Sequence, residues 1–337
     1  MNIAINGFGR IGRAVFKEII LRKEKNINVV AINDLTDTKT LAHLLKYDTC
    51  YGIFPKEVKA TADSIVVGGK KYLVCAEKDP AKLPWKKLDV DIVIESTGFF
   101  RTKETAGAHI KAGAKKVIIS APGKGGNIKT IIMGVNEDKV SKSDKIISNA
   151  SCTTNCLAPI TEVIRQNFGI KKALMTTIHS YTADQRLVDG PHKDLRRARA
   201  AATNMIPTTT GAAIAATEAI PSLKGKFDGM SIRVPLSVVS ITDIVFITKK
   251  KTDARAVNEA LKKASKSARM KNILAVSDEP LVSSDYIGNP SSAIVDLPLT
   301  KVVDGDMVKV VAWYDNEWGY SVRLVDLCEY INKKKLI

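Results

Sequence analysis

Cys152 is the side chain of this sequence best placed for covalent chemistry. It follows a strand-like run, Lys145–Ser148, and comes just before an apolar-periodic stretch, Leu157–Phe168, that predicts a helix. Free amides and the positive dipole end at a helix start favour the thiolate, which is the nucleophilic form of cysteine. The polar neighbours Ser151 and Thr153 argue against a cysteine that only fills an apolar core.

A nucleophilic thiol needs a neighbouring base, and His179 is the best candidate among the four histidines. It ends the strand-like run Leu174–Ile178 and leads into a long irregular segment, so it can face Cys152 across a cleft. Spacing alone leaves this pairing open. Surface or packing roles are assigned to the other histidines, His43, His109 and His192, and structural roles to the cysteines Cys50, Cys75 and Cys328.

A glycine-rich turn near the start of the chain suits a dinucleotide. The run Gly7-Phe8-Gly9-Arg10-Ile11-Gly12 has the pattern G-x-G-x-x-G, directly after a predicted strand and at the opening of a predicted helix. The glycines let the backbone turn tightly and approach a pyrophosphate, whose charge then sits at the helix N-terminus. Asp34 ends the next strand, where a carboxylate can accept hydrogen bonds from ribose hydroxyls and repel a 2′-phosphate. This favours NAD over NADP; a cap or turn role for Asp34 is the alternative.

The elements that position these residues fall into two halves. In the first half, β-branched runs alternate with amphipathic stretches, which predicts βαβ units and a parallel sheet. After about residue 150 the strands are longer and alternate with polar positions, which predicts a mostly antiparallel sheet with one covered face. The strands predicted are Asn2–Asn6, Ile27–Asn33, Asp91–Ser96, Lys116–Ser120, Ala173–Ser180, Ser231–Thr248 and Met307–Tyr314, with a hairpin within Val58–Ala76. The helices predicted are Phe8–Lys23 and Lys103–Ala112, and others that begin near Cys152, Thr210, Asp253 and Trp318.

The composition excludes several classes of protein. With 337 residues, 45% of them hydrophobic and 26% charged, the chain can bury a core, so it is neither disordered nor fibrous. The net charge of +17 fits a nucleic-acid surface, attraction of small anions, or a solvated lysine-rich surface, and the dispersal of the lysines favours the last. Five scattered cysteines indicate reduced thiols and no metal site. Without a signal-like start or an apolar run of about 18 residues, a cytoplasmic protein without a membrane span is expected.

In combination, these motifs resemble those of phosphorylating glyceraldehyde-3-phosphate dehydrogenases. The segment Ala150–Pro159 is similar to the active-site signature of that family. Further matching blocks span nearly the whole chain in the family's order: Asn6–Arg13, Ser96–Phe100, Ser120–Pro122, His179–Thr182, Asp194–Arg199, Pro207–Ala213 and Trp313–Tyr320.

The resemblance implies a fold and an assembly. It implies an α/β protein with a Rossmann-type NAD-binding domain over 1–151 and an α+β catalytic domain with a mostly antiparallel sheet over 152–317. A C-terminal helix over 318–337 would pack back on the first domain. The family also forms homotetramers, in which the irregular loop Thr182–Pro207 reaches the cofactor site of a neighbour; a loop of that length is usually functional.

The resemblance also implies a reaction, the NAD-dependent oxidation of D-glyceraldehyde 3-phosphate to 1,3-bisphosphoglycerate. Cys152 would attack the aldehyde to give a hemithioacetal, and His179 would take the hydroxyl proton as hydride leaves for the nicotinamide. Inorganic phosphate would then displace the resulting thioester. The residues implied for the two phosphate sites are Ser151, Thr153, Thr182, Arg197, Thr210, Gly211 and Arg233. Arg233 lies in an otherwise apolar strand, where a bound anion explains a cation better than isolation does.

For the cofactor, the resemblance implies that Arg10 and Ile11 line the pyrophosphate and Asp34 the ribose. Ser120 and Tyr320 would lie near the nicotinamide half, and Asn316 would bind the carboxamide. Lys78 stands near the adenine where the family usually has Arg. Other departures are Tyr51 and Ile53, where His and Arg are common, and Gly190 before Pro191, where Leu is common. The last leaves some NADP tolerance open, although Asp34 opposes it.

Two alternatives remain from the sequence. A sister enzyme that acts on erythrose 4-phosphate shares the thiol and the Rossmann half. A basic nucleic-acid-binding or scaffold protein could keep the fold without the chemistry. The Cys152, His179 and Arg233 set, and the lack of aromatic residues clustered with Lys and Arg, argue against the second alternative.

Overall fold

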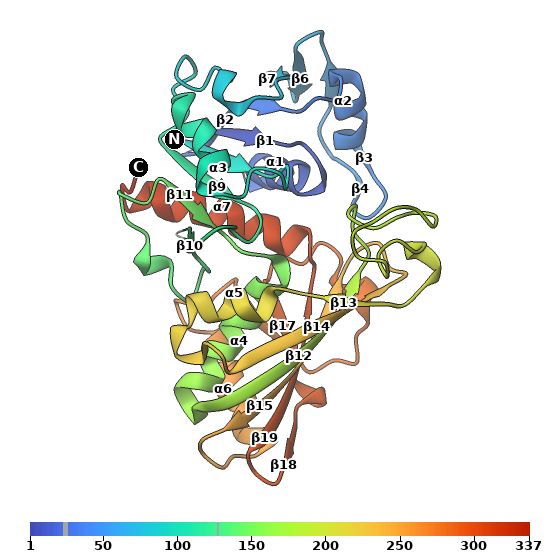
Figure 1. Cartoon of the computed structure of the whole chain (residues 1–337), viewed down its shortest axis with the longest axis vertical. Coiled ribbons are helices and arrows are strands. Elements are labelled where there is room, and N and C mark those ends of the chain that lie inside the picture. The colour runs from blue at the N-terminus through green and yellow to red at the C-terminus, as the bar shows by residue number, and fades with distance from the viewer. Residues whose placement is uncertain (23–25, 127) are drawn as a thin grey trace. The chain divides into compact units, whose positions relative to one another are not determined.

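The computed structural model describes residues 1–22, 26–126 and 128–337, and the chain folds as two compact units (Figure 1). Unit 1 comprises Met1–Ile131, Glu137–Ala150 and Ser321–Ile337, and unit 2 comprises Ile132–Asn136 and Ser151–Tyr320. Within the described ranges, no helix is long and apolar enough to span a bilayer.

Unit 1 is built on a sheet whose strands run in the order β10-β11-β9-β8-β1-β2-β7-β6-β5. The strands from β10 to β7 pair in parallel, while β5, β6 and β7 form an antiparallel meander at one edge. The central strands are fully buried along their length, as expected where helices cover both faces of a parallel sheet. The strands are β1 Asn2–Asn6, β2 Asn28–Asn33, β3 Tyr47–Asp48, β4 Gly52–Ile53, β5 Val58–Ala60, β6 Ser64–Val67, β7 Lys70–Cys75, β8 Ile92–Glu95, β9 Lys116–Ile119, β10 Lys129–Thr130 and β11 Ile146–Ser148.

The helices of this part are α1 Arg10–Arg22, α2 Thr38–Lys46, α3 Lys103–Lys111 and α7 Trp318–Lys333. Arg22 of α1 forms ion pairs with Asp326 and Glu329 of α7, at 2.6 and 3.2 Å, so the end of the chain packs on its beginning. The predicted parallel strands, the edge hairpin and both predicted helices are confirmed. Helix α1 begins at Arg10 rather than Phe8, because the glycine-rich turn occupies the first positions, and its predicted last residue, Lys23, lies outside the described residues.

Unit 2 is built on a second sheet with the order β13-β14-β12-β15-β19-β17-β16, and β18 pairs with β19. Its strands are β12 Ile170–Ser180, β13 Ile206–Thr209, β14 Phe227–Val234, β15 Ser240–Thr248, β16 Leu274–Ser277, β17 Ala293–Asp296, β18 Lys301–Val303 and β19 Met307–Tyr314. Helices α4 Cys152–Phe168, α5 Ala212–Ala219 and α6 Ala254–Ser265 pack against it. In β15, buried and half-exposed residues alternate, so one face is covered as predicted.

The predicted strand Ser231–Thr248 was too long. The chain leaves the sheet between β14 and β15, where Pro235 cannot donate a ladder hydrogen bond and Val239 has φ +70°. The pair β12 and β14 is parallel, so the sheet is mixed, although most of its pairs are antiparallel.

Candidate functional site

The glycine-rich turn of unit 1 leaves room for a ligand at one position and none at two others. Gly7 has φ +90°, and a Cβ there would lie 2.7 Å from the Thr97 nitrogen. A Cβ on Gly12 would lie 2.1 Å from the Gly7 carbonyl oxygen, whereas a Cβ on Gly9 would meet no atom within 4 Å. Two glycines are therefore needed for packing and the third opens space at the start of α1. This arrangement fits the close approach of a pyrophosphate.

Asp34, directly after β2, is held beside this turn. Its Oδ2 accepts a hydrogen bond from the Phe8 amide at 2.8 Å, and its Oδ1 accepts one from the Thr36 amide at 3.0 Å. Ser120 follows β9, and its amide donates to the Glu95 carbonyl at 2.9 Å. Lys78 is exposed. Unit 1 thus brings the fingerprint glycines and Asp34 together at the carboxyl ends of parallel strands.

The departures at positions 51 and 53 differ in their surroundings. The Arg10 guanidinium lies 5.5 Å from the centre of the Tyr51 ring and 2.9 Å from Oδ2 of Asp48, so the ring and the carboxylate hold the Arg10 side chain. Ile53 is exposed. With its side chain engaged in this way, Arg10 would meet a cofactor through its backbone amide.

In unit 2, Cys152 is the first residue of α4. Ser151 caps this helix, because its Oγ accepts a hydrogen bond from the Thr154 amide at 3.1 Å. Cys152 is half-buried, and its Sγ lies 3.5 Å from Nε2 of His179. The predicted pairing of thiol and imidazole is therefore present in the structure.

His179 is buried near the end of β12 beside a cation. The parallel register of β12 and β14 places it opposite Arg233. Its Nδ1 lies 2.7 Å from the Ser180 carbonyl oxygen, to which Arg233 Nη1 also donates at 3.1 Å. Arg233 Nη1 also lies 2.9 Å from Nδ1 itself. With its proton on Nδ1, donated to the Ser180 carbonyl, the ring directs the Nε2 lone pair at the sulfur, and Arg233 Nη1 then donates to that carbonyl alone. Burial, followed by the charge of Arg233, lowers the pKa of His179 to about 3, so the ring is neutral at pH 7.

The thiol itself is not activated by the helix start alone. Burial raises the pKa of Cys152 above its ordinary value, while the Arg233 charge and hydrogen bonds from Thr153 act in the opposite direction. The expectation that the helix N-terminus would keep Cys152 as a thiolate is therefore not met in the chain without a bound ligand. The loss of solvent raises the pKa of the thiol by more than the nearby donors lower it. A proton acceptor is needed, and neutral His179 supplies one.

Two guanidinium groups of unit 2, those of Arg233 and Arg197, lie near enough for their charges to lower the pKa of His179. Arg233 Nε is buried and has no hydrogen-bond partner in the described part of the chain. Arg197 donates to Thr208 Oγ1 at 2.9 Å and to the Thr209 carbonyl at 3.1 Å, and its Nη1 is 2.6 Å from Oδ2 of Asp184. These contacts hold a guanidinium group at the end of the long loop, next to β13.

The start of α5 adds backbone donors. Gly211 precedes this helix, and a Cβ there would meet nothing within 4 Å. Thr154 Oγ1 of α4 donates to the Ala212 carbonyl at 3.4 Å, so the starts of α4 and α5 are adjacent. Thr210 Oγ1 accepts from the Ala212 amide, the first of α5, at 3.2 Å. The Thr182 amide donates to Gln185 Oε1 at 3.3 Å.

Tyr314 was missed by the sequence reasoning. Its hydroxyl lies 2.8 Å from both Thr153 Oγ1 and Thr177 Oγ1, and its ring meets His179 edge-on with centroids 6.0 Å apart. Tyr314 therefore contacts His179 directly and the neighbour of Cys152, Thr153, through its hydroxyl. The signal in the sequence was its place as the last residue of the predicted strand Met307–Tyr314, two residues before Asn316.

Asn316 is oriented by two serines that were also missed. Its Oδ1 accepts hydrogen bonds from Ser180 Oγ at 2.8 Å and Ser240 Oγ at 3.1 Å. This arrangement directs the amide nitrogen away from both hydroxyls. Tyr320 is buried.

Comparisons with known proteins agree with this organisation. The family model described as glyceraldehyde 3-phosphate dehydrogenase, NAD binding domain, matches residues 1–103, and the C-terminal domain model of the same family matches residues 151–316. Glyceraldehyde-3-phosphate dehydrogenase from Geobacillus stearothermophilus is 56% identical over 337 residues, which cover 100% of this chain and 99% of that protein. Glyceraldehyde-3-phosphate dehydrogenase 2 of Bacillus subtilis is 54% identical over 98% of this chain and 96% of its own length. The enzyme of that name from Zymomonas mobilis is 50% identical over 99% of both chains.

Proposed function

The chain belongs to the glyceraldehyde-3-phosphate dehydrogenase family, and from that premise we propose that Cys152 and His179 carry its reaction. The protein is an NAD-dependent oxidoreductase of the glycolytic aldehyde, glyceraldehyde 3-phosphate. The observation that carries the residue assignment is the 3.5 Å contact between Cys152 Sγ and His179 Nε2, beside the half-buried guanidinium of Arg233. A cytoplasmic location is part of the proposal, since all five cysteines are free thiols.

His179 moves the protons of the first half-reaction. Neutral His179 accepts the thiol proton while Cys152 Sγ bonds to the aldehyde carbon, and it returns that proton to the aldehyde oxygen to give a hemithioacetal. The imidazole then takes the same proton from the hydroxyl as the carbon loses hydride, which leaves a thioester on Cys152. The amide of Cys152 at the helix start stabilises the oxyanion. Bound NAD supplies the acceptor for the hydride.

Inorganic phosphate completes the second half-reaction. A phosphate oxygen attacks the thioester carbon, the carbon–sulfur bond breaks, and the products are an acyl phosphate and the Cys152 thiolate. We assign the donors for the two phosphate groups to Arg197, Arg233 and Thr182, and to the helix starts at Ser151, Thr153, Thr210 and Gly211. Ser151 Oγ accepts from the Thr154 amide, and Thr153 Oγ1 shares a hydrogen bond with the Tyr314 hydroxyl. Backbone amides at the helix start add further donors.

A bound phosphate also makes His179 a better base. The Arg233 charge is one of the two largest causes that lower the pKa of His179. An anion on the unpartnered side of Arg233 offsets that charge, so the pKa of the imidazole rises when substrate binds. The site is thus completed by the charge of its own substrate.

For the cofactor we assign the pyrophosphate to the turn Gly7–Gly12 and the ribose to Asp34. Lys78 and Ser120 are assigned to the edge of the same site in unit 1. Asn316, whose amide nitrogen is oriented as a donor, is assigned to the nicotinamide carboxamide, and Tyr320 to the nicotinamide ring.

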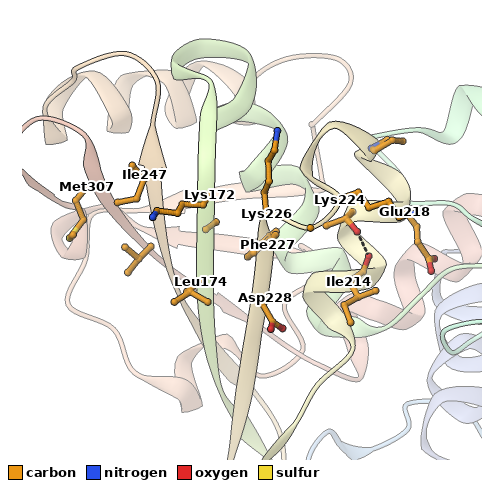
Figure 2. A pocket seen from close by; sticks show the side chains of 15 residues that line it. Lys172, Leu174, Ile214, Glu218, Lys224, Lys226, Phe227, Asp228, Ile247 and Met307 are labelled. Carbon is orange, nitrogen blue, oxygen red and sulfur yellow. Dashed lines mark hydrogen bonds between the residues drawn. The ribbon is translucent and has the colours of Figure 1, made fainter.

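Self-association, as a tetramer, is proposed from an apolar groove on the exposed face of the unit 2 sheet. The volume of the groove is about 1190 Å³. Figure 2 shows Leu174 of β12, Ile214 of α5 and Met307 of β19, which line this groove. These side chains are 65%, 59% and 45% exposed, which is unusual for large apolar residues gathered on one surface. Lys172, Lys224, Lys226, Glu218 and Asp228 add both charge signs, which suits a second copy across a two-fold axis. Leu174→Glu should reduce the mass measured by analytical ultracentrifugation.

The proposed reaction is tested by NADH formation from glyceraldehyde 3-phosphate, NAD and phosphate, followed at 340 nm and repeated without phosphate. A fast turnover that requires phosphate is expected. Full turnover without phosphate would show that water, not phosphate, resolves the thioester. A higher kcat/KM for erythrose 4-phosphate would assign the chain to the sister activity.

A further inference from the structure

A buried cluster of polar side chains lies beneath the glycine-rich turn and is not used by the reaction. Its centre is the carboxylate of Glu95, at the end of β8, which is 1% exposed. Glu95 Oε2 lies 2.5 Å from Asn6 Nδ2 and 3.0 Å from His109 Nε2. Glu95 Oε1 accepts hydrogen bonds from the Thr97 amide at 2.9 Å and from the Thr97 hydroxyl. Each carboxylate oxygen therefore accepts hydrogen bonds from two donors.

The direction of each hydrogen bond at His109 follows from Trp85. The Trp85 Nε1–H, 3.0 Å from His109 Nδ1, can only donate, so Nδ1 is the acceptor nitrogen of the ring. The proton of neutral His109 is then on Nε2, where it points at Glu95. Trp85 and His109 are both fully buried, so water cannot substitute for either contact.

A second chain of contacts fixes the amide of Asn6. Asn33 Oδ1 accepts from the Glu77 amide and its Nδ2 donates to the Glu77 carbonyl, both at 2.9 Å, which sets the orientation of the Asn33 side chain. Asn33 Nδ2 also donates to Asn6 Oδ1 at 2.7 Å, so Nδ2 of Asn6 must face Glu95. The ends of β1, β2 and β8 are thereby joined to one carboxylate.

This carboxylate acts on the turn through Thr97. The Thr97 nitrogen is the atom that a Cβ on Gly7 would approach to 2.7 Å, so Thr97 packs directly on the turn. Ser96 Oγ donates to the Gly7 carbonyl at 2.8 Å, and Thr97 Oγ1 accepts from the Phe99 amide at 3.1 Å. Glu95 thus holds the segment 96–99 against the backbone of the glycine-rich turn.

We propose that Glu95 is a positioning residue for the dinucleotide site, and that Trp85 and His109 orient it by fixing the tautomer of the imidazole. The inference rests on the proposed placement of the pyrophosphate at the turn Gly7–Gly12. A positioning role and a purely electrostatic role of Glu95 predict opposite changes in NAD affinity when its charge is removed. Removal of a negative charge near a pyrophosphate would strengthen NAD binding by attraction alone, whereas loss of positioning weakens it.

The test is NAD affinity of the purified full-length protein, measured by isothermal titration calorimetry, with kinetics as a second readout. Glu95→Gln should weaken NAD binding at least about fivefold. The NH2 group of glutamine is a donor, so the donors that pointed at one carboxylate oxygen of Glu95 would lose their acceptor. The increase in KM for NAD should exceed the decrease in kcat. Glu104→Gln, the same change at an exposed residue of α3, is the matched control and should leave the affinity unchanged. Unchanged or tighter NAD binding by Glu95→Gln would overturn the proposal.

A double variant tests the role of the tautomer. In Glu95→Gln, His109 could accept at Nε2 only by moving its proton to Nδ1, which the Trp85 donor prevents. Trp85→Phe removes that donor, so the double variant should bind NAD within about twofold of Trp85→Phe alone. If the losses of NAD binding free energy in Glu95→Gln and Trp85→Phe add in the double variant, the tautomer argument is overturned. If Glu95→Gln does not fold, Thr97→Val, which deletes one donor to Oε1, replaces it and should weaken NAD binding about threefold; no weakening overturns the proposal.

Gly9→Val separates this inference from the proposed function. It fills the open space at the turn without a backbone conflict. If Gly9→Val loses NAD binding while Glu95→Gln binds NAD as tightly as the wild type, the positioning role of Glu95 is overturned and the placement of the cofactor stands. Normal NAD binding in Gly9→Val would overturn the placement of the cofactor.

Discussion

Each of the two units buries a histidine, and the partners of the two rings differ in kind. His109 in unit 1 has a donor, Trp85, at one nitrogen and an acceptor, Glu95, at the other. His179 in unit 2 faces a thiol at one nitrogen, and both the Ser180 carbonyl and the Arg233 guanidinium at the other. A single tautomer meets both contacts of His109, whereas the thiol beside His179 can give its proton to the ring. Burial alone does not separate a structural histidine from a reactive one; the chemistry of the partners does.

Removal of the sulfur gives the largest expected effect. Cys152→Ser should lower kcat by a factor of about 10³ or more, because a hydroxyl is a far weaker nucleophile than a thiol next to the same base. The measurement is NADH formation at saturating substrate. Cys50→Ser, at a half-buried thiol of unit 1, is the matched control and should remain fully active. Turnover of the Cys152 variant near the wild-type rate would place the chemistry elsewhere.

The same substitution in both histidines sharpens the contrast. His179→Gln should lower kcat about 10²–10⁴-fold with little change in the free energy of unfolding. His109→Gln should instead lower the free energy of unfolding by about 1–3 kcal/mol, because Glu95 or Trp85 loses its partner in a dry core. Steady-state kinetics and urea denaturation of both variants measure the two effects. A reversal of these effects would contradict the division of roles.

Arg233→Lys tests the unpartnered side of the cation. Lysine keeps the charge but lacks the planar fork, so the KM for phosphate or aldehyde should rise about tenfold. Kinetics with each substrate varied in turn give this number. An unchanged KM for both substrates would mean that the Arg233 Nε–H has no anion to bind.

The pKa of His179 predicts a pH-dependent loss of stability. Its pKa is about 3 in the folded chain and near 6.5 in a solvated one, so between these values the unfolded state binds more protons. Stability therefore decreases as the pH falls through this window, by about 2 kcal/mol at pH 5 from this residue. Denaturation of the wild type and His179→Gln at pH 7.5 and 5 isolates the contribution. Equal pH dependence in the two proteins would show that His179 titrates normally.

Lys78→Arg restores the side chain usual in the family and gives the smallest expected effect. Lys78 is exposed, so the KM for NAD should change less than about twofold. A larger decrease would show that the guanidinium recognises the adenine half of the cofactor.

Local patterns predicted much of the framework because strand and helix periods are local properties. The run Asn2–Asn6 is a strand from its first to its last predicted residue, and Cys152 begins its helix as expected. The break between β14 and β15 was missed although Pro235 is a local signal against a continuous strand, whereas the positive φ of Val239 has no such signal. His109 was assigned only to surface or packing, because its partners Trp85 and Glu95 are 24 and 14 residues away in sequence. Long-range hydrogen bonds of this kind depend on the fold and leave no local period.

Ala150, which lies directly before the Ser151 cap, has φ +53° and is fully buried. A left-handed conformation costs a residue with a β-carbon about 1–2 kcal/mol, so glycine would be the less strained occupant. Alanine has fewer accessible backbone conformations than glycine, so it restricts the backbone at this position more than glycine would. We therefore expect Ala150→Gly to relieve this backbone strain and to leave the backbone next to Cys152 less restricted.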